Sequence, residues 1–222
     1  MVNIMYYIRY SIYLYVLIGY SLAYCGSFDD YFNAIKKDDA ATVSTLLGRG
    51  FDPNTLNPAG EHGLIVAVRE PSLRVISVML NSAKVNVEVR TPQDESPLML
   101  AALQGLTELC RLLITLGADV NKPGWTALHY AATNGHLKTI QLLLDEYAYI
   151  DAASPNGTTP LMMAGHYGSD AAVRLLLDAG AEPTLKNDQG LSAMDFAHLV
   201  SRRDAAEMIA ATIRGRQPKG TW

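Results

Sequence analysis

The chain has 222 residues, of which 49% are hydrophobic and 18% charged, and its formal net charge is −4. This composition is that of globular material, and the length suits one ordinary domain or one array of repeats. The mildly acidic balance and the missing basic runs argue against nucleic-acid binding. Two cysteines are too few for a disulfide framework.

The first residues differ in composition from the rest of the chain. Residues 1–24 hold seven of the twelve tyrosines and a single charged side chain. The run Ser11–Ala23 is uncharged and has the length of the apolar region of a secretory signal, but it is shorter than a full membrane span. Ala23 and Cys25 fit the small-residue positions of a cleavage site. We therefore predict a signal peptide at residues 1–25 and export, with the bacterial periplasm as the expected location.

Two alternatives for this segment stay open. An uncleaved membrane anchor is favoured by the tyrosines and the weakly positive start. A lipoprotein is a third option because the segment ends in Cys25, but the bulky Tyr24 stands where such signals need a small residue. Cleavage after Cys25 would leave Cys110 without an intramolecular partner. Cys110 lies at an apolar helical position, which predicts a buried and inert thiol.

A tetrad, a pattern of four consecutive residues, recurs through the rest of the chain at residues 62–65, 96–99, 126–129, 159–162 and 192–195. The third residues of the five tetrads are 34, 30, 33 and 33 positions apart: Leu64, Leu98, Leu128, Leu161 and Met194. Small residues, a turn glycine and an apolar-periodic helix follow the tetrads. Serine or threonine at the start can cap a helix, and proline next to it suits the first helical position. Since no unit can bury its apolar face alone, stacking must supply the core.

A period of about 33 residues with a T-P-L-H-x-A pattern resembles the ankyrin repeat. The resemblance covers roughly residues 28–214. It implies an all-α repeat solenoid of stacked helix-turn-helix units with short β-hairpin fingers. The expected division is a capping unit at 26–54, repeats one to four at 55–90, 91–120, 121–151 and 152–184, a C-terminal capping repeat at 185–214, and a disordered tail at 215–222.

The chain departs from the family pattern at several places. Repeat one has Gly63 in place of proline, Pro71 in place of the turn glycine, and one extra residue before its closing loop. The tetrad histidine is kept only at His129, so the hydrogen bonds of that histidine are expected to be missing from most units. Two residues separate Asn121 from Gly124, where family members have about five. The finger between repeats two and three is therefore predicted to be a stub.

No pattern in the sequence indicates chemistry. His129 and His136 occupy family positions where histidine makes structural hydrogen bonds, and further ligands at metal-site spacing are missing. We find no nucleophile elbow, phosphate loop or pair of carboxylates typical of a catalytic cleft. We therefore predict a protein that is not an enzyme, with no cofactor and no metal.

The resemblance implies a partner-binding surface instead. Ankyrin proteins contact partners through the residue between the finger glycine and the tetrad, and through the pair before the turn glycine. Carried onto this chain, these positions are Arg69, Glu70, Glu95, Leu103, Gln104, Trp125, Thr133, Asn134, Thr158, His166 and Tyr167. Trp125 and Tyr167 stand out, because exposed aromatic residues often anchor interfaces. For Trp125, packing onto the shortened finger is an equally good interpretation.

The sequence thus favours an exported, non-catalytic and monomeric protein that binds another protein through its concave groove and finger loops. We expect no nucleic-acid partner, and membrane contact only if residues 1–25 stay uncleaved. The alternatives are a membrane-anchored structural protein of the envelope and a secreted effector or inhibitor of a partner enzyme.

Overall fold

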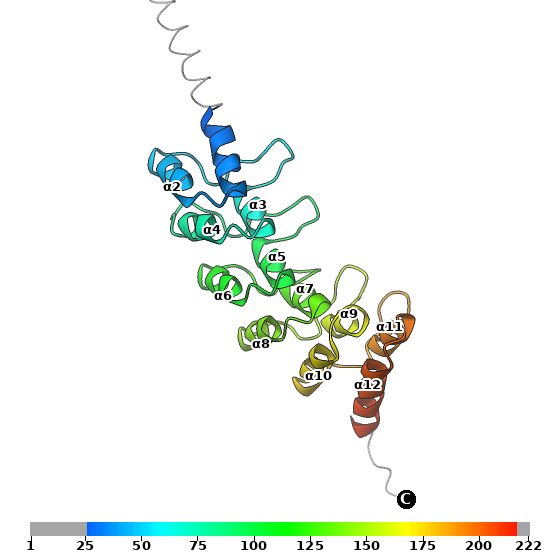
Figure 1. Ribbon diagram of the computed structural model, residues 1–222. Coiled ribbons are helices and arrows are strands. Elements are labelled where there is room, and N and C mark those ends of the chain that lie inside the picture. The colour runs from blue at the N-terminus through cyan, green and yellow to red at the C-terminus, as the bar shows by residue number, and fades with distance from the viewer. Residues whose placement is uncertain (1–25, 217–222) are drawn as a thin grey trace, which may run out of the picture. The chain divides into compact units, whose positions relative to one another are not determined.

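The computed structural model describes residues 26–216, and these form helices joined by loops (Figure 1). Two isolated antiparallel bridges, Leu56–His62 and Lys186–Ser192, mark two of the fingers. The predicted signal segment, residues 1–25, and residues 217–222 lie outside the described part. Between residues 26 and 216, no helix is long and apolar enough to cross a membrane.

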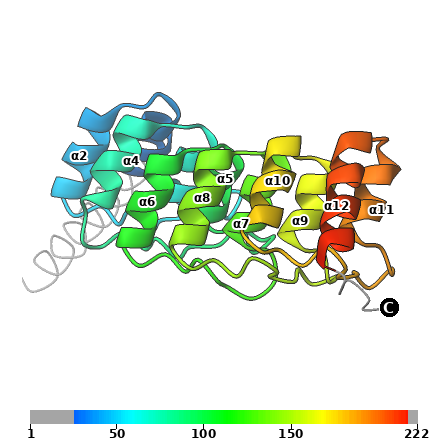
Figure 2. The ribbon, with the colours of Figure 1, turned by 90° about the horizontal axis from the view of Figure 1, so that it is seen from below.

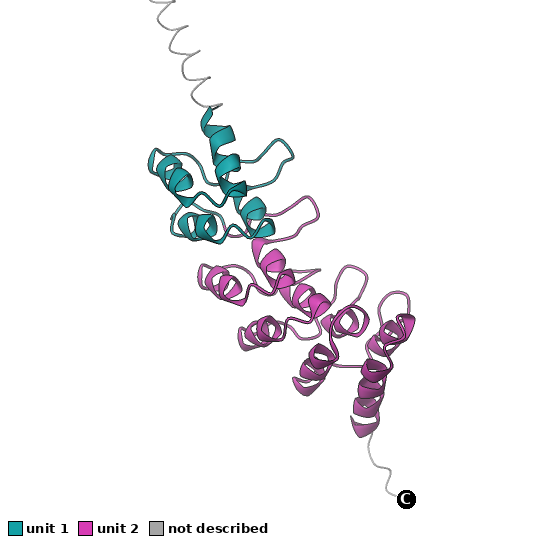
Figure 3. Ribbon diagram, in the orientation of Figure 1, with its two compact units in different colours: residues 1–86 teal, residues 87–222 magenta. Residues whose placement is uncertain are grey.

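The chain divides into two compact units, one ending at Asn86 and one beginning at Val87 (Figure 3). The first unit contains helical residues 26–36, α2 (Ala40–Gly48), α3 (Gly63–Arg69) and α4 (Leu73–Leu80). The second contains α5 (Pro97–Leu103), α6 (Thr107–Thr115), α7 (Ala127–Asn134), α8 (Leu137–Asp145), α9 (Pro160–His166), α10 (Asp170–Asp178), α11 (Ala193–Leu199) and α12 (Arg203–Arg216).

An aromatic cluster forms the core of the first unit. Tyr31 is fully buried, and its ring centroid lies 4.6 Å from that of Phe51. Its hydroxyl donates a hydrogen bond to the carbonyl of Pro53 at 3.0 Å. A Cβ on Gly63 would lie 2.6 Å from this hydroxyl. Glycine therefore replaces the tetrad proline in repeat one because Tyr31 already fills the space.

The second unit is built from two layers of helices. One layer is formed by α5, α7, α9 and α11, which pack in that order, and the other by α6, α8, α10 and α12 (Figures 1 and 2). The tetrad leucines of the first layer, such as Leu98 and Leu128, are completely buried. This is the predicted solenoid of helix pairs, in which each pair covers the apolar face of the next.

Serine and threonine caps start the helices of the first layer as the tetrads predict. Ser96 Oγ accepts a hydrogen bond from the backbone N–H of Met99 at 3.1 Å, and Thr159 Oγ1 accepts one from Met162 at 3.4 Å. A proline is the first residue of both helices, α5 and α9, where its missing donor costs nothing.

In the second unit, the side chain of the fourth residue of each tetrad accepts a hydrogen bond from the backbone N–H of the capping residue. His129 Nδ1 accepts from the backbone N–H of Thr126 at 3.2 Å. In the other repeats of this unit a different atom does the same: Sδ of Met99 and of Met162 at 3.4 Å, and Oδ2 of Asp195 at 2.7 Å. The expectation that the histidine's bonds are missing from most units is therefore wrong for this bond.

The loop that follows the second helix of a unit is called its closing loop. A polar side chain in one closing loop accepts a hydrogen bond from the backbone of the next closing loop. In the first unit Asn54 Oδ1 accepts from Asn86 N at 2.8 Å; in the second, Glu88 Oε1 accepts from Asp119 N at 2.9 Å, Asn121 Oδ1 from Tyr149 N at 2.7 Å, and Asp151 Oδ1 from Glu182 N at 3.0 Å. The accepting residues are 34, 33 and 30 positions apart. The same kind of bond is therefore kept within each unit, although repeat one has an extra residue and the stub lacks three.

The last helix, α12, continues to Arg216, two residues beyond the predicted end of the C-terminal repeat at residue 214. Arg216 Nη1 donates to the carbonyl of Ala181 at 2.9 Å, and its Nη2 donates to that of Leu177 at 3.4 Å. These carbonyls stand at the end of α10, so the arginine extends the packing of α12 past residue 214.

Candidate partner-binding surface

The shortened finger is closed by a lysine side chain. In the neighbouring fingers a backbone bond spans the tip, as from Thr91 N to Glu95 O at 3.0 Å. In the stub, Lys122 is 8% exposed, and its ammonium group lies 2.5 Å from Oδ2 of Asp94. It also donates to the carbonyls of Pro123 at 3.0 Å and Trp125 at 3.4 Å. The lysine therefore holds the backbone that carries the predicted anchor Trp125.

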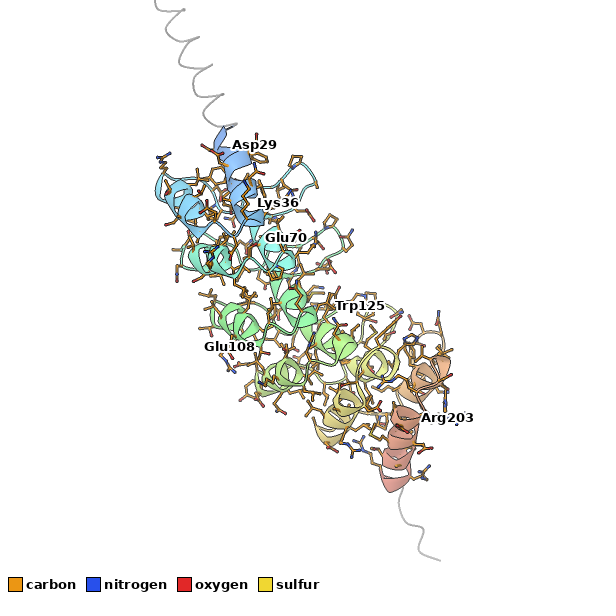
Figure 4. All side chains as sticks on the ribbon, viewed as in Figure 1. Asp29, Lys36, Glu70, Glu108, Trp125 and Arg203 are labelled. Atoms are coloured by element: carbon orange, nitrogen blue, oxygen red, sulfur yellow. The ribbon has the colours of Figure 1, made fainter. Side chains whose placement is uncertain are left out.

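A hollow of about 260 Å³ opens beside the stub. It is lined by Leu103 at the end of α5, Trp125 in the stub, His129, Tyr130 and Thr133 on α7, and Met163 on α9. Figure 4 labels Trp125 on the side where α5 and α7 lie, with Glu108 of α6 on the other side. Three of the predicted contact residues, Leu103, Trp125 and Thr133, therefore share one mainly apolar site.

His129 forms the buried floor of this hollow. Its Nδ1 accepts from Thr126 N, so the proton is on Nε2, which donates to the carbonyl of Thr158 at 2.9 Å. Burial lowers the pKa of His129 to about 4. The ring is therefore neutral at physiological pH, and the Trp125 ring stands edge-on to it at 5.2 Å.

Glu95 brings a carboxylate to the edge of the hollow. The hydroxyl of Tyr130 donates to Glu95 Oε1 at 3.0 Å. Burial raises the pKa of Tyr130, and the bonded carboxylate raises it further. Tyr130 therefore stays a neutral donor, and Glu95, itself a predicted contact residue, is linked to the site through it.

The pair before each turn glycine lies at the ends of the first-layer helices. Asn134 is exposed, and its amide donates to the carbonyl of Leu103 at 2.7 Å, which joins α7 to α5. Gln104 is half-buried at the end of α5. One repeat further on, Tyr167 is 60% exposed, and its ring lies 4.0 Å from that of the half-buried His166. His166 and Tyr167 lie at the end of α9, outside the lining of the hollow.

The other predicted contact residues, Thr158 and the pair Arg69 and Glu70, do not line the hollow. Thr158 is 2% exposed, so its side chain is not available to a partner. The cause is the next finger, which lies against this one: Asp188 N donates to the carbonyl of Asn156 at 3.0 Å. Arg69 and Glu70 are exposed in the first unit, where Arg69 forms an ion pair with Glu61.

The family model described as ankyrin repeats, three copies, matches residues 32–123 and 98–187, which together exceed half of the chain. The chain belongs to the ankyrin repeat family. Ankyrin repeats are protein–protein interaction modules.

Relatives of known sequence come from distant organisms. The chain is 33% identical over 153 residues to the nuclear factor NF-kappa-B p105 subunit of Mus musculus, a match covering 66% of this chain and 16% of that protein. It is 28% identical over 183 residues to a putative ankyrin repeat-containing protein of Treponema pallidum, covering 78% of this chain and 59% of that protein. The chain thus spans less than two thirds of the length of these curated relatives.

Two solved structures of bacterial origin are similar over most of the chain. One is a chain in the structure of a predatory endopeptidase from Bdellovibrio bacteriovorus in complex with an immunity protein. Its TM-score is 0.72 at 28% identity, covering 82% of this chain and 97% of that chain. The other is an ankyrin repeat domain from Acinetobacter baumannii, with a TM-score of 0.71 at 25% identity, covering 82% and 96%.

Besides His129, for which the sequence predicted a structural role, the hollow has two lining residues that sequence reasoning missed, Tyr130 and Met163. Both directly follow a tetrad and occupy the same position in consecutive repeats. Tyr130 lies three residues before Thr133, which places both on one face of α7. Comparing the position after the tetrad between repeats could have found them, because the position holds large side chains in both.

His136 and Cys110 are the other residues that the sequence raised as candidates for metal binding or catalysis, and the structure gives both a structural role. Nε2 of His136 donates to the carbonyl of Leu103 at 2.9 Å, and a Cβ on Gly105 would lie 2.5 Å from the ring. Cys110 is completely buried, and burial raises the pKa of its thiol to about 12. Among residues 26–216, no three His, Cys, Asp or Glu side chains are grouped so that they could hold a metal ion.

Proposed function

We propose that this chain binds a protein partner through the concave groove of its second unit, and that the hollow beside Trp125 receives an apolar or aromatic side chain of that partner. The observation that carries the proposal is the hollow itself. Indole, phenol, leucine and methionine side chains line it, and its histidine floor is neutral. Such a lining suits the buried anchor that dominates many interfaces.

Binding without catalysis is the mode of action we propose. The thiol of Cys110 and the imidazole of His129, two groups that could in principle act in catalysis, are both completely buried. His129 uses both ring nitrogens in hydrogen bonds within the protein. These environments favour structural roles for both residues.

Export to the periplasm remains part of the proposal, and its support is the sequence of residues 1–25. Mapping the mature N-terminus by mass spectrometry tests it. A mature chain that begins near Gly26 is the expected result. An intact residue 1 in a membrane fraction would instead favour the anchored structural protein.

Inhibition of a partner enzyme is a second candidate, and one comparison favours it. The similar chain from Bdellovibrio bacteriovorus belongs to a complex of an endopeptidase with an immunity protein. By this analogy the partner would be a peptidase whose activity falls when the chain binds. Titrating the purified chain against an enzyme that co-purifies with it would test this: unchanged turnover at saturating chain would contradict it.

The binding surface is tested by substitutions that keep the fold. Trp125→Ala and Tyr130→Ala should each weaken partner binding at least tenfold, because truncating a central anchor costs roughly 2 kcal/mol or more. Leu112→Ala, which removes an exposed leucine from α6, is the matched control and should bind as the wild type does. If all three variants recover the same partner with equal affinity, the hollow is not the binding site.

A further inference from the structure

A tyrosine occupies a backbone conformation that three other closing loops give to glycine. Tyr147 follows the C-cap of α8 with φ of 62°. Gly50, Gly117 and Gly180 stand at the corresponding place after α2, α6 and α10, with φ of 90°, 93° and 104°. Left-handed φ is unfavourable for a residue with a Cβ, and bulky residues rarely adopt it. The side chain at this position must therefore have a benefit elsewhere.

Packing within the protein does not provide that benefit. Tyr147 is 84% exposed, the largest exposed fraction among the large hydrophobic side chains of residues 26–216. Tyr149, two residues later, is 67% exposed. It occupies the place that Asp119 and Glu182 hold in the neighbouring loops, since all three backbone N–H groups donate to the preceding loop. Repeat three thus places two aromatic rings where the two neighbouring repeats have a glycine and an acidic residue.

The backbone that carries the two rings is held rigidly. A single side chain, Asn121, donates to the carbonyl of Tyr147 at 2.9 Å and accepts from the N–H of Tyr149 at 2.7 Å. Tyr147 N also donates to Leu144 O at 3.0 Å. Two exposed rings on a fixed backbone lose little conformational freedom when they bind, which favours a contact role.

Four carboxylates lie in the loop that carries the two rings, or just before it, and in the adjoining loops. Asp145 and Glu146 come directly before Tyr147, and Asp119 and Glu182 lie in the adjoining loops on either side of Tyr149. Arg216 forms an ion pair with Glu182 at 3.7 Å, so the proposal uses the other three carboxylates, Asp119, Asp145 and Glu146. Aromatic faces and carboxylates together attract a cation with an apolar stem.

We propose that Asp119, Asp145, Glu146, Tyr147 and Tyr149, the closing-loop patch, dock a basic segment of a second protein. Arginine or lysine side chains of that segment lie across the tyrosine rings and reach the carboxylates. The patch follows α8, in the layer away from the Trp125 hollow (Figure 1). It is therefore a second surface, and it stands whether or not the hollow binds a partner.

The first test separates a binding role from a folding role. Tyr147→Gly places at this position the residue that follows α2, α6 and α10. We expect its thermal midpoint to rise by roughly 2–4 °C, because the backbone strain is relieved and little packing is lost. Gly117→Tyr, which creates the same conflict one repeat earlier, should lower the midpoint. A lower midpoint for Tyr147→Gly would mean that the ring stabilises the fold, which would overturn the proposal.

The second test measures binding with a defined probe. A synthetic peptide of alternating arginine and serine is titrated into the full chain, with an aspartate–serine peptide of equal length as the control. We expect the arginine peptide alone to bind, about 3- to 10-fold more weakly to Tyr147→Gly and to Tyr149→Ala, and more weakly in high salt. Trp125→Ala and Tyr167→Ala should bind as the wild type does.

Two outcomes would contradict the assignment of a basic partner. Equal affinity of wild type and Tyr147→Gly for the arginine peptide, including no measurable affinity of either, would overturn it. Self-association of the wild-type chain that Tyr147→Gly abolishes would assign the patch to a second copy instead, and would overturn it as well.

Discussion

Lys122 Nζ lies 2.5 Å from Oδ2 of Asp94, and this ion pair connects two departures from the repeat pattern. Asp94 has φ of 63° at the finger position where Gly124, Gly157 and Gly190 stand in the other repeats of the unit. Lys122 belongs to the finger that has lost three residues. The carboxylate that replaces glycine in one finger is thus the partner of the buried ammonium group that closes the next.

The first prediction concerns the coupling within this pair. Asp94→Asn removes the charge but keeps a residue that tolerates left-handed φ. It should lower the free energy of unfolding by about 1–3 kcal/mol, because Lys122 then lacks a counter-charge. Lys122→Met keeps the buried stem. In a double-mutant cycle measured by urea unfolding, we expect a coupling of about 1 kcal/mol, because Asp94 is largely exposed. Strictly additive effects would show that the ion pair contributes nothing.

The repeat architecture could be predicted because its rules are local. Caps, turn glycines and apolar spacing recur within each unit, so one sequence contains five copies of the same signal. The stub was predictable for the same reason, as a missing stretch in a repeated pattern. The ion pair that closes it was not, since Lys122 and Asp94 lie in different repeats and only the fold brings them together.

The candidate site was predictable in part. Family positions identified Leu103, Trp125 and Thr133, which line the hollow. The same positional rule failed at Thr158, because the packing of one finger against the next buries it. Whether a given position faces a partner or a neighbouring finger depends on finger length, which the rule does not include.

The second prediction tests whether the short finger is needed for binding. Residues 122–123 are replaced by the five residues of the next finger, 152–156, which restores the usual length. We expect the chain to fold, and the groove partner to bind at least tenfold more weakly, because the longer finger covers the hollow. Exchanging residues 152–156 for 185–189 keeps that finger's length and is the control. Unchanged affinity of the lengthened chain would mean that the deletion is merely tolerated.

The third prediction is that a substitution toward the repeat pattern lowers the stability of the protein. Gly63→Ala brings repeat one closer to the alanine-containing tetrads, but its Cβ would lie 2.6 Å from Tyr31 Oη. We expect a loss of about 1–3 kcal/mol in the free energy of unfolding, as for other overpacked sites. Gly48→Ala, where a Cβ meets nothing within 4 Å, is the control and should be neutral or stabilising.

Chemical denaturation of both alanine variants provides the measurement for this third prediction. Combining Gly63→Ala with Tyr31→Leu should recover part of the loss relative to Tyr31→Leu alone, because the hydroxyl that causes the clash is gone. If Gly63→Ala is as stable as the wild type, the explanation of this glycine by Tyr31 is wrong.

The fourth prediction is a pH dependence centred on His129. Burial lowers its pKa from 6.5 to about 4, so between these values the unfolded chain binds the proton more readily than the folded chain. His129 therefore stabilises the fold fully above about pH 6.5, and this contribution falls as the pH drops, levelling off below about pH 4. The physical cause is burial of the ring, which disfavours its charged form and outweighs the opposing effect of the hydrogen bond that Nε2 donates to Thr158 O.

His129→Met isolates this contribution, because Met99 and Met162 already serve at the same tetrad position and do not titrate. At pH 7 the variant should be less stable than the wild type, since the bond to the Thr158 carbonyl is lost. At pH 5 the difference should shrink by roughly 1–2 kcal/mol, as the wild type loses the histidine contribution. Other titrating groups are shared and cancel in the difference. A stability gap that stays constant between pH 7 and pH 5 would show that His129 titrates normally and is not sealed in the floor of the hollow.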